Sequence, residues 1–182
     1  MSCLLTAGIS KGCRDNRGGI KRVLIANKEM ISGLTPTSDN DVTGITLISM
    51  NTNPLTSSAY TFFEFLPNKM SSNVVENVQS NLQNGTAGFE QVLTLLFAKN
   101  NATLRNQVKL MAQAELVAIV EDYNSTYWYY GEFNGLELNG GNSQTGTALS
   151  DMNGWTLTLS GYEPYPARIV TDSAIGTLGF TA

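Results

Sequence analysis

Four aromatic residues in a row, within the stretch STYWYYGEF, constrain the fold of this chain more than any other feature. Side chains alternate between the two faces of a β-strand, so Trp128 and Tyr130 would share one face. Tyr127, Tyr129 and Phe133 would lie on the other face. Three explanations fit aromatic side chains on both faces: a core strand packed on both sides, a strand between the core and a neighbouring subunit, and a sugar-binding platform.

Alternating apolar and polar residues, often β-branched or aromatic, predict strands in several other stretches. With the aromatic stretch, the expected strands are 20–27, 41–49, 59–67, 73–82, 88–98, 115–123, 125–133 and 155–163. The dipeptide Asn84-Gly85 is a strong hairpin-turn signal. We therefore expect the two stretches on either side of it to pair as an antiparallel hairpin.

A single amphipathic helix is expected over 101–114, where Leu104, Val108 and Met111 recur at three- and four-residue spacing. Asn100 or Asn101 is available as its N-cap.

Segments rich in Gly, Pro, Ser and Asn are expected to be loops. They are 33–41, 50–58 and 134–154, followed later by a semi-extended stretch over 163–170 and a weakly structured tail. The fold class is therefore all-β with one packed helix, an antiparallel β-sandwich or barrel of about eight strands. The 182 residues are expected to form one domain, 1–182, with a flexible N-terminal segment and a C-terminal tail.

The chain contains no histidine, so it lacks the commonest general base near neutral pH, and Ser-His-Asp and Cys-His mechanisms are excluded. Its two cysteines, Cys3 and Cys13, cannot supply the four ligands of a structural zinc. Glu121 and Asp122 stand at a strand end, where solvated charge is usual. We expect no enzymatic activity, no cofactor and no metal.

Charged residues make up 14% of the chain, against a typical ~25%. Interface centres are depleted in charge, so this composition fits a surface covered by neighbouring subunits, and it equally fits a secreted β-rich adhesin. The net charge is −4 and no run of Lys or Arg occurs, which argues against tight nucleic-acid binding. No stretch approaches the roughly 20 apolar residues of a membrane span, and no secretory apolar region opens the chain. We expect a soluble protein that is made in the cytoplasm and has no membrane contact.

Two stretches resemble a known family. GGIKRVLIAN, which follows a Cys-containing loop, and GWTLTLSGYEPYPARIV, near the C-terminus, look like the opening and closing strands of tail-tube-like structural proteins of tailed bacteriophages. The resemblance is to phages of Bacteroides-type hosts, including crAss-like phages. It implies a small β-barrel or sandwich flanked by one helix, in a virion protein of the tail that is made in the bacterial host.

In that family, sheets of adjacent subunits join into an inner barrel around a lumen through which DNA is ejected. The resemblance implies self-assembly into hexameric rings that stack into a tail tube, or into dodecameric rings of a neck or tail barrel. The implied partners are copies of the chain itself, adjacent tail or neck ring proteins, and DNA in transient, non-specific passage.

Inter-subunit contacts are expected from the aromatic strand, the 134–154 loop and the N-terminal segment to Gly19, and ring-to-ring contacts from the 32–42 loop. The side chains expected in these contacts are Tyr127, Trp128, Tyr129, Tyr130, Phe133, Asn142 and Trp155. Acidic residues facing the lumen are expected to be Glu64, Glu76 and Glu90. The alternative is a carbohydrate-binding β-sandwich, a receptor-binding or adhesin module, in which the four consecutive aromatics act with Asn134, Asn139 and Asn142.

Overall fold

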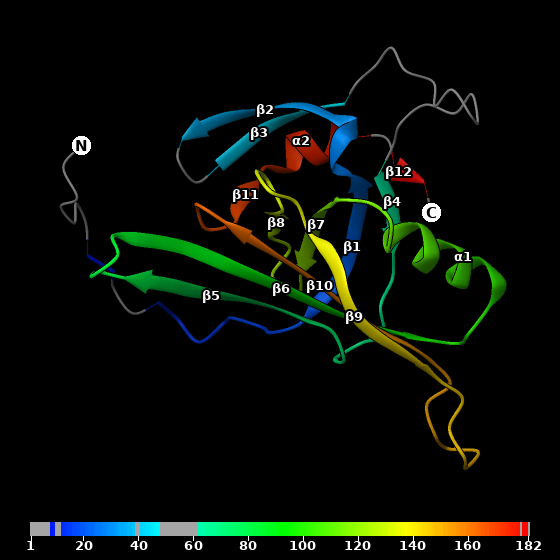
Figure 1. Ribbon diagram of the computed structural model, residues 1–182. Coiled ribbons are helices and arrows are strands. Elements are labelled where there is room, and N and C mark those ends of the chain that lie inside the picture. Colours follow the sequence, from blue (N-terminus) through cyan, green and yellow to red (C-terminus); the bar gives the residue numbers. More distant parts are fainter. Residues whose placement is uncertain (1–7, 10–11, 39–40, 48–61, 179, 182) are drawn as a thin grey trace.

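The computed structural model describes residues 8–9, 12–38, 41–47, 62–178 and 180–181. Over these residues the protein is mostly β, with two packed sheets (Figure 1). A β-sandwich is therefore confirmed, whereas a closed barrel is wrong, because each sheet has two unpaired edge strands. The predicted loop 50–58 lies outside the described residues.

The larger sheet has eight strands in the order β12-β4-β1-β7-β8-β11-β3-β2. Their bounds are β1 Ile20–Asn27, β2 Ile31–Ser38, β3 Asp41–Leu47, β4 Phe62–Phe65, β7 Leu116–Asp122, β8 Tyr127–Tyr130, β11 Arg168–Val170 and β12 Phe180–Thr181. Most neighbours are antiparallel, and only the β11–β3 and β12–β4 pairs are parallel.

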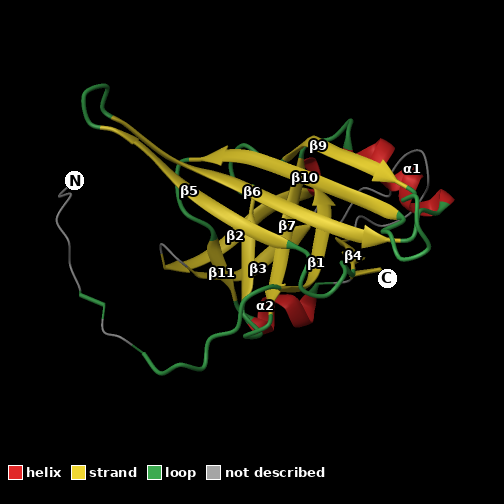
Figure 2. Ribbon diagram, turned by 90° about the horizontal axis from the view of Figure 1, so that it is seen from below, coloured by secondary structure: helices red, strands yellow, loops and turns green. Residues whose placement is uncertain are grey.

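The smaller sheet has four antiparallel strands in the order β5-β6-β10-β9. They are β5 Asn73–Asn81, β6 Thr86–Ala98, β9 Glu137–Gln144 and β10 Gly154–Glu163. The helices are α1 Ala102–Met111 and α2 Asp172–Thr177, with a 3₁₀ turn at Lys28–Met30. Seen from below in Figure 2, no helix lies over the four-stranded sheet.

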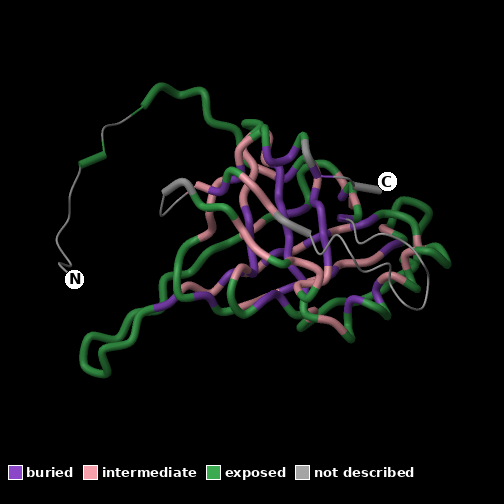
Figure 3. Tube along the Cα trace, turned by 90° about the horizontal axis from the view of Figure 1, so that it is seen from above, coloured by how far each residue is buried: buried purple, intermediate pink, exposed green. Residues whose placement is uncertain are grey.

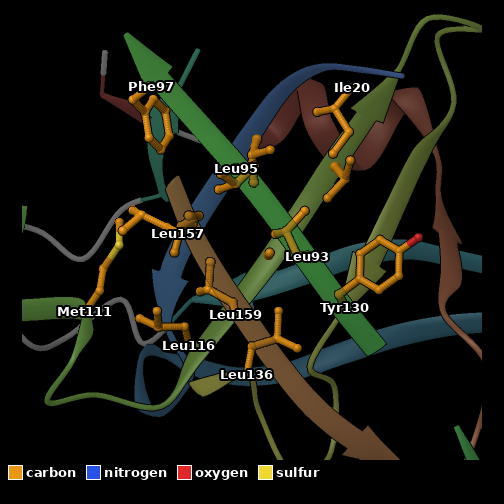
Figure 4. Packing of buried hydrophobic residues seen from close by; sticks show 14 of the residues in the cluster. Ile20, Leu93, Leu95, Phe97, Met111, Leu116, Tyr130, Leu136, Leu157 and Leu159 are labelled. Atoms are coloured by element: carbon orange, nitrogen blue, oxygen red, sulfur yellow. The ribbon is translucent and has the colours of Figure 1, made fainter. Parts of the chain in front are cut away.

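The main core fills the space between the two sheets (Figure 4). Leu93 and Leu95 of β6 and Leu157 and Leu159 of β10 point into it, and α1 closes one end with Met111. Each of these leucines is nearly inaccessible to water, and burial of such a side chain contributes about 1.5–3 kcal/mol. The strict alternation in β6 and β10 thus orients one face inward and the other outward.

A second core lies on the opposite face of the eight-stranded sheet. Short helix α2 covers it with Ala174 and Ile175, and Leu178 follows directly after the helix. Ile31, Leu34 and Ile45 of the β2–β3 pair pack against the same cluster; the sequence had not suggested this layer.

Strand β8 lies between the two cores. Tyr130 belongs to the core between the sheets, with Trp128 packed against it, while Tyr129 belongs to the second core, with Tyr127 packed against it. The predicted alternation is correct, and the first of the three explanations holds within the chain: β8 is a core strand packed on both faces. The second layer is this chain's own α2 and its surroundings, not a neighbouring subunit.

Several predicted elements are confirmed. Asn81 and Thr86 close the predicted hairpin around a turn in which Gly85 has a φ of 64°, a conformation that suits glycine. The α1 helix begins as predicted, with the Asn101 side chain accepting a hydrogen bond from the backbone N–H of Leu104.

Three segments predicted to be irregular are regular instead. The 33–41 loop is largely strand β2, which tolerates Pro36 because it is an edge strand. The 134–154 loop contains β9, and the expected weak tail contains α2 and β12. Strand β11 lies in the 163–170 stretch that was expected to be semi-extended. The described residues therefore hold twelve strands rather than about eight. The error has one cause: these segments are short or rich in Gly and Asn, and pairing with a neighbour decides their structure.

Candidate functional site

The candidate site is the outer face of the four-stranded sheet, the face turned away from the eight-stranded sheet. β6 and β10 place on it the residues that alternate with the core leucines. These are Glu90, Val92, Thr94 and Leu96 on β6 and Thr156, Thr158, Ser160 and Tyr162 on β10. The flanking strands add Val75, Asn77 and Gln79 on β5 and Glu137, Asn139 and Asn142 on β9. No described helix or strand packs over this face (Figure 2).

Both edges of this sheet are open. β5 and β9 each pair with one strand only, and nearly all of their residues are exposed. An open edge presents a row of backbone N–H and C=O groups that can pair with a strand of another chain.

The charge of the four strands is of one sign. The chain has 11 Lys and Arg and 15 Asp and Glu, and the four strands hold none of the former and four of the latter. The acids are Glu76, Glu90, Glu137 and Glu163. The rest of the chain therefore has 11 residues of each sign, and the whole net charge of −4 arises from this sheet.

Tyr162 is the one tyrosine among the outer-face residues, and 49% of it is exposed. Its ring lies over Gly88 of the neighbouring strand, where a Cβ would come within 2.5 Å of the ring atoms. Shallow hollows flank it. Glu90 and Gln79 line one of them, and Asn134, Glu137 and Asn139 line the other. Sequence reasoning missed Tyr162, although its place in the alternation of WTLTLSGYE indicated an outward side chain.

The far half of the β5–β6 hairpin projects beyond the body of the molecule (Figures 1 and 2). Figure 3 marks it as exposed along both strands. Its apolar side chains are largely exposed: Val78 is 68% and Leu82 97% exposed. Exposed apolar residues on a projecting hairpin are typical of a contact with another chain.

The base of the hairpin is held in place by a network of hydrogen bonds. The buried Gln91 side chain donates to Glu76 Oε1 at 3.0 Å and accepts from the Gly131 N–H at 3.0 Å. The same Glu76 oxygen accepts from the Ala167 N–H at 2.8 Å. β5 and β6 are thus tied to the turn after β8 and to the connection before β11, so the outer face has a fixed position on the sandwich.

The turn after β8 is held by a buried carboxylate, that of Glu163. Glu163, 1% exposed, accepts hydrogen bonds from the backbone N–H groups of Phe133, Asn134 and Gly135 at 2.9–3.2 Å. This turn adjoins the outer face next to Tyr162, so Glu163 fixes one wall of the site from the inside.

Two of the four predicted contact residues of β8 have little surface for a partner. Tyr129 is 2% and Tyr130 5% exposed within the chain alone. The Tyr127 hydroxyl accepts from Arg22, and the Trp128 indole N–H donates to Asp122 Oδ2 at 3.3 Å. Tyr129 and Tyr130 are therefore core residues of the chain itself, whereas Tyr127 and Trp128 are half-buried and their subunit contacts remain predictions.

The other predicted contact residues lie in different places. Phe133 is 44% exposed and pairs with Tyr165 at a ring-centroid distance of 5.6 Å. Trp155 is half-buried beneath Arg105, and its indole N–H donates to Asn100. Only Asn142 lies on the outer face. Subunit contacts of these residues remain predictions.

Of the three predicted lumen acids, only Glu90 lies on the outer face, where it accepts from Asn77 and Gln79 at 3.4 and 3.3 Å. Glu76 turns inward to Gln91, as described above. Glu64 lies in the other sheet and forms an ion pair with Arg22 at 3.1 Å. The sequence missed Glu137, because the strand that places it on the outer face had been predicted to be a loop.

The ion pairs of Arg22 belong to the scaffold. Glu121, 2% exposed, binds both Arg22 and Lys21. Burial raises the pKa of Glu121, but the hydrogen bonds from Lys21 and Arg22 outweigh it and hold the pKa below its usual value. This cluster joins β1, β4 and β7 far from the outer face, and it has a structural explanation.

Two further findings concern the described part of the chain. It contains no group of three or more Asp, Glu, Cys or His side chains that could hold a metal ion. None of its helices has the length and apolarity that crossing a lipid bilayer requires.

Comparisons of the chain with protein-family models, curated proteins and solved structures found no match.

Proposed function

We propose that this chain is a virion structural protein of a tailed bacteriophage that assembles into rings of a tail tube or of a neck or tail barrel. The observation that carries the proposal is the four-stranded sheet, which has two open edges, an uncovered outer face and no positive charge in its strands. The family resemblance of the first and last long strands points the same way.

The order of strands fixes how copies would join. β5 and β9 lie at opposite edges and are separated by three antiparallel steps, so they run in opposite directions. In a ring with rotational symmetry, β9 of one copy meets β5 of the next, and this pair is antiparallel like all others in the sheet. Joining therefore continues the existing hydrogen-bond pattern without a change of strand direction.

The inner surface of such a barrel would be the outer face of the sheet, because the eight-stranded sheet covers the other side. That surface offers hydroxyls, amides and the carboxylates of Glu90 and Glu137, but no Lys or Arg. Tight, non-specific DNA binding requires cations that contact phosphates. A lumen of this composition lets DNA pass without retaining it.

Mass photometry and negative-stain microscopy of the purified protein test the proposal. We expect closed rings of six or twelve copies. Asn77→Pro and Val78→Pro each remove one N–H from β5, and neighbouring N–H groups point to opposite sides of a strand. One of the two variants thus loses an N–H that faces the open edge, and we expect it to remain folded by circular dichroism and to lose the rings. A wild-type protein that stays monomeric at all concentrations overturns the proposal.

A second function, binding of carbohydrate, is favoured by Tyr162. A half-exposed tyrosine ring that lies flat on a sheet, between carboxylates and amides, is a suitable surface for stacking a pyranose ring. Here the stacking residue is Tyr162 instead of the β8 aromatics, and Asn134 and Asn139 stay in the site. A monomer that binds on a glycan array, with binding lost in Tyr162→Ala and kept in Tyr165→Ala, would establish this function in place of the first.

A further inference from the structure

We infer that Asn84, at the tip of the β5–β6 hairpin, is a site of spontaneous deamidation, and that the fold directs this reaction to Asn84 among four chemically equivalent positions. Asparagine followed by glycine occurs at Asn84, Asn134, Asn139 and Asn153. The inference does not depend on the proposed function.

The reaction needs no enzyme and no oxidant. The backbone nitrogen of the glycine attacks the asparagine Cγ, a C–N bond forms, and the side-chain nitrogen leaves as ammonia. Water then opens the resulting succinimide at either carbonyl, giving aspartate or isoaspartate. Glycine favours the reaction because it has no Cβ to hinder the attack and it rotates freely. Both the glycine N–H and the asparagine side chain must be free to move toward each other.

Two of the four positions are held in place by buried neighbours. The Gly135 N–H donates to Glu163 Oε1 at 3.2 Å, and the Asn134 side chain donates to the Tyr162 carbonyl. Gly154, which follows Asn153, is buried so tightly that a Cβ there would lie 1.9 Å from the Phe97 carbonyl oxygen. Neither glycine nitrogen can reach the asparagine Cγ without local unfolding.

Asn139 is held by strand structure. It lies within β9, at the irregularity in its pairing with β10, and its side chain donates to Ser160 Oγ. An extended strand backbone keeps the asparagine side chain away from the next nitrogen, so this position also requires local opening.

Asn84 has none of these restraints. It lies in the exposed turn between β5 and β6, at the end of the hairpin that is farthest from the core (Figures 2 and 3). Its own backbone N–H donates to Asn81 Oδ1 at 3.2 Å, and its side chain has no hydrogen bond to any described residue. Within the described residues, the Gly85 N–H has no hydrogen-bond partner, and Gly85 has already adopted a φ of 64°.

Deamidation would add a carboxylate to a hairpin that has two glutamates and no cation in its strands. Isoaspartate would also lengthen the turn by one backbone atom. Both changes affect a surface that projects from the molecule and leave the core untouched, so the folded protein would accumulate the modified form with age.

The test is incubation of the folded protein at mildly alkaline pH and 37 °C, followed by peptide mass spectrometry of all four positions, with isoaspartate identified by its methyltransferase. We expect Asn84 to react about tenfold faster or more than the other three, because each of those must first break hydrogen bonds. The same protein unfolded in urea is the control, and there the four rates should converge.

Asn84→Ser should abolish the fastest modification and leave the thermal unfolding temperature unchanged. Equal rates at the four positions in the folded protein, or a rate ratio that persists in urea, would overturn the inference. Because the readout is chemical, its outcome does not depend on whether rings form.

Discussion

Tyr129 and Tyr130 are adjacent in the chain, yet their side chains lie in two different cores on opposite faces of the eight-stranded sheet. Strand β8 therefore contributes side chains to both layers of packing, as β1 and β7 also do. Truncating either side chain to alanine should therefore reduce the stability of the fold by a similar amount, although the two side chains contact different residues.

We predict that Tyr129→Ala and Tyr130→Ala each lower the free energy of unfolding by about 3–5 kcal/mol, as is usual for a large buried aromatic residue. Tyr165→Ala, at a side chain that is 56% exposed, should cost less than about 1 kcal/mol. Urea denaturation followed by tryptophan fluorescence measures all three. A small loss for Tyr129→Ala would contradict the assignment of α2 as the cover of the second core.

The pH dependence of stability should reflect Glu121. Its pKa is lower in the folded protein than the usual 4.5, so the stabilisation that its ion pairs provide is complete above about pH 4.5 and disappears as the pH falls through the folded value. Wild type should therefore lose much of its stability advantage over Glu121→Gln when urea denaturation is repeated at decreasing pH. Glu115→Gln is the control, because Glu115 is exposed and lies 3.6 Å from Lys28. A pH-independent difference between wild type and Glu121→Gln would rule out this role.

The contribution of the Asn101 cap to stability should be measurable by comparison with a matched asparagine in the same helix. Asn101→Ala removes the acceptor of the Leu104 N–H and should cost about 0.5–2 kcal/mol. Asn106→Ala, at an exposed position within α1, should leave the free energy of unfolding unchanged or raise it by about a few tenths of a kcal/mol, because alanine favours helix. Thermal unfolding of both variants checks this, and equal effects would count against the cap.

Gly161 should tolerate no side chain. A Cβ there would lie 2.2 Å from the Gly135 carbonyl oxygen, so Gly161→Ala should lower the free energy of unfolding by about 1–3 kcal/mol. Gly176→Ala is the control, because no atom lies within 4 Å of its Cβ position and it is helical. Chemical denaturation distinguishes the two, and a stable Gly161→Ala would mean that the β8–β9 turn lies farther from β10.

Reversing charge on the outer face should create DNA binding. We expect the double variant Glu90→Lys/Glu137→Lys to bind short duplex DNA in a salt-dependent manner, while wild type does not. Glu29→Lys/Asp172→Lys changes the net charge equally at exposed positions away from the outer face. Fluorescence polarisation at two salt concentrations compares them. Equal binding by both double variants would show that net charge, and not the outer face, is responsible.

The part of the fold that the sequence predicts is the part with strong local signals. The hairpin around Asn84-Gly85, the Asn101 cap and the alternation in β6 and β10 all arise from neighbouring residues, and each is confirmed. Strand β9 was missed because ELNGGNSQ has the composition of a loop, and its pairing with β10 makes it a strand. Because β9 was not predicted, Glu137 was not included among the predicted site residues.

The sequence by itself determined that aromatic side chains lie on both faces of this strand, that histidine-dependent chemistry is excluded and that no run of Lys or Arg occurs. Only the tertiary structure decided what covers the second face and where the negative charge gathers. An alternation with period two indicates which side chains of a strand are buried, but it does not indicate which element covers them. A helix of the same chain and a neighbouring subunit are both compatible with the same alternation. Charge on an open sheet likewise depends on strands that lie far apart in the sequence and meet only after folding.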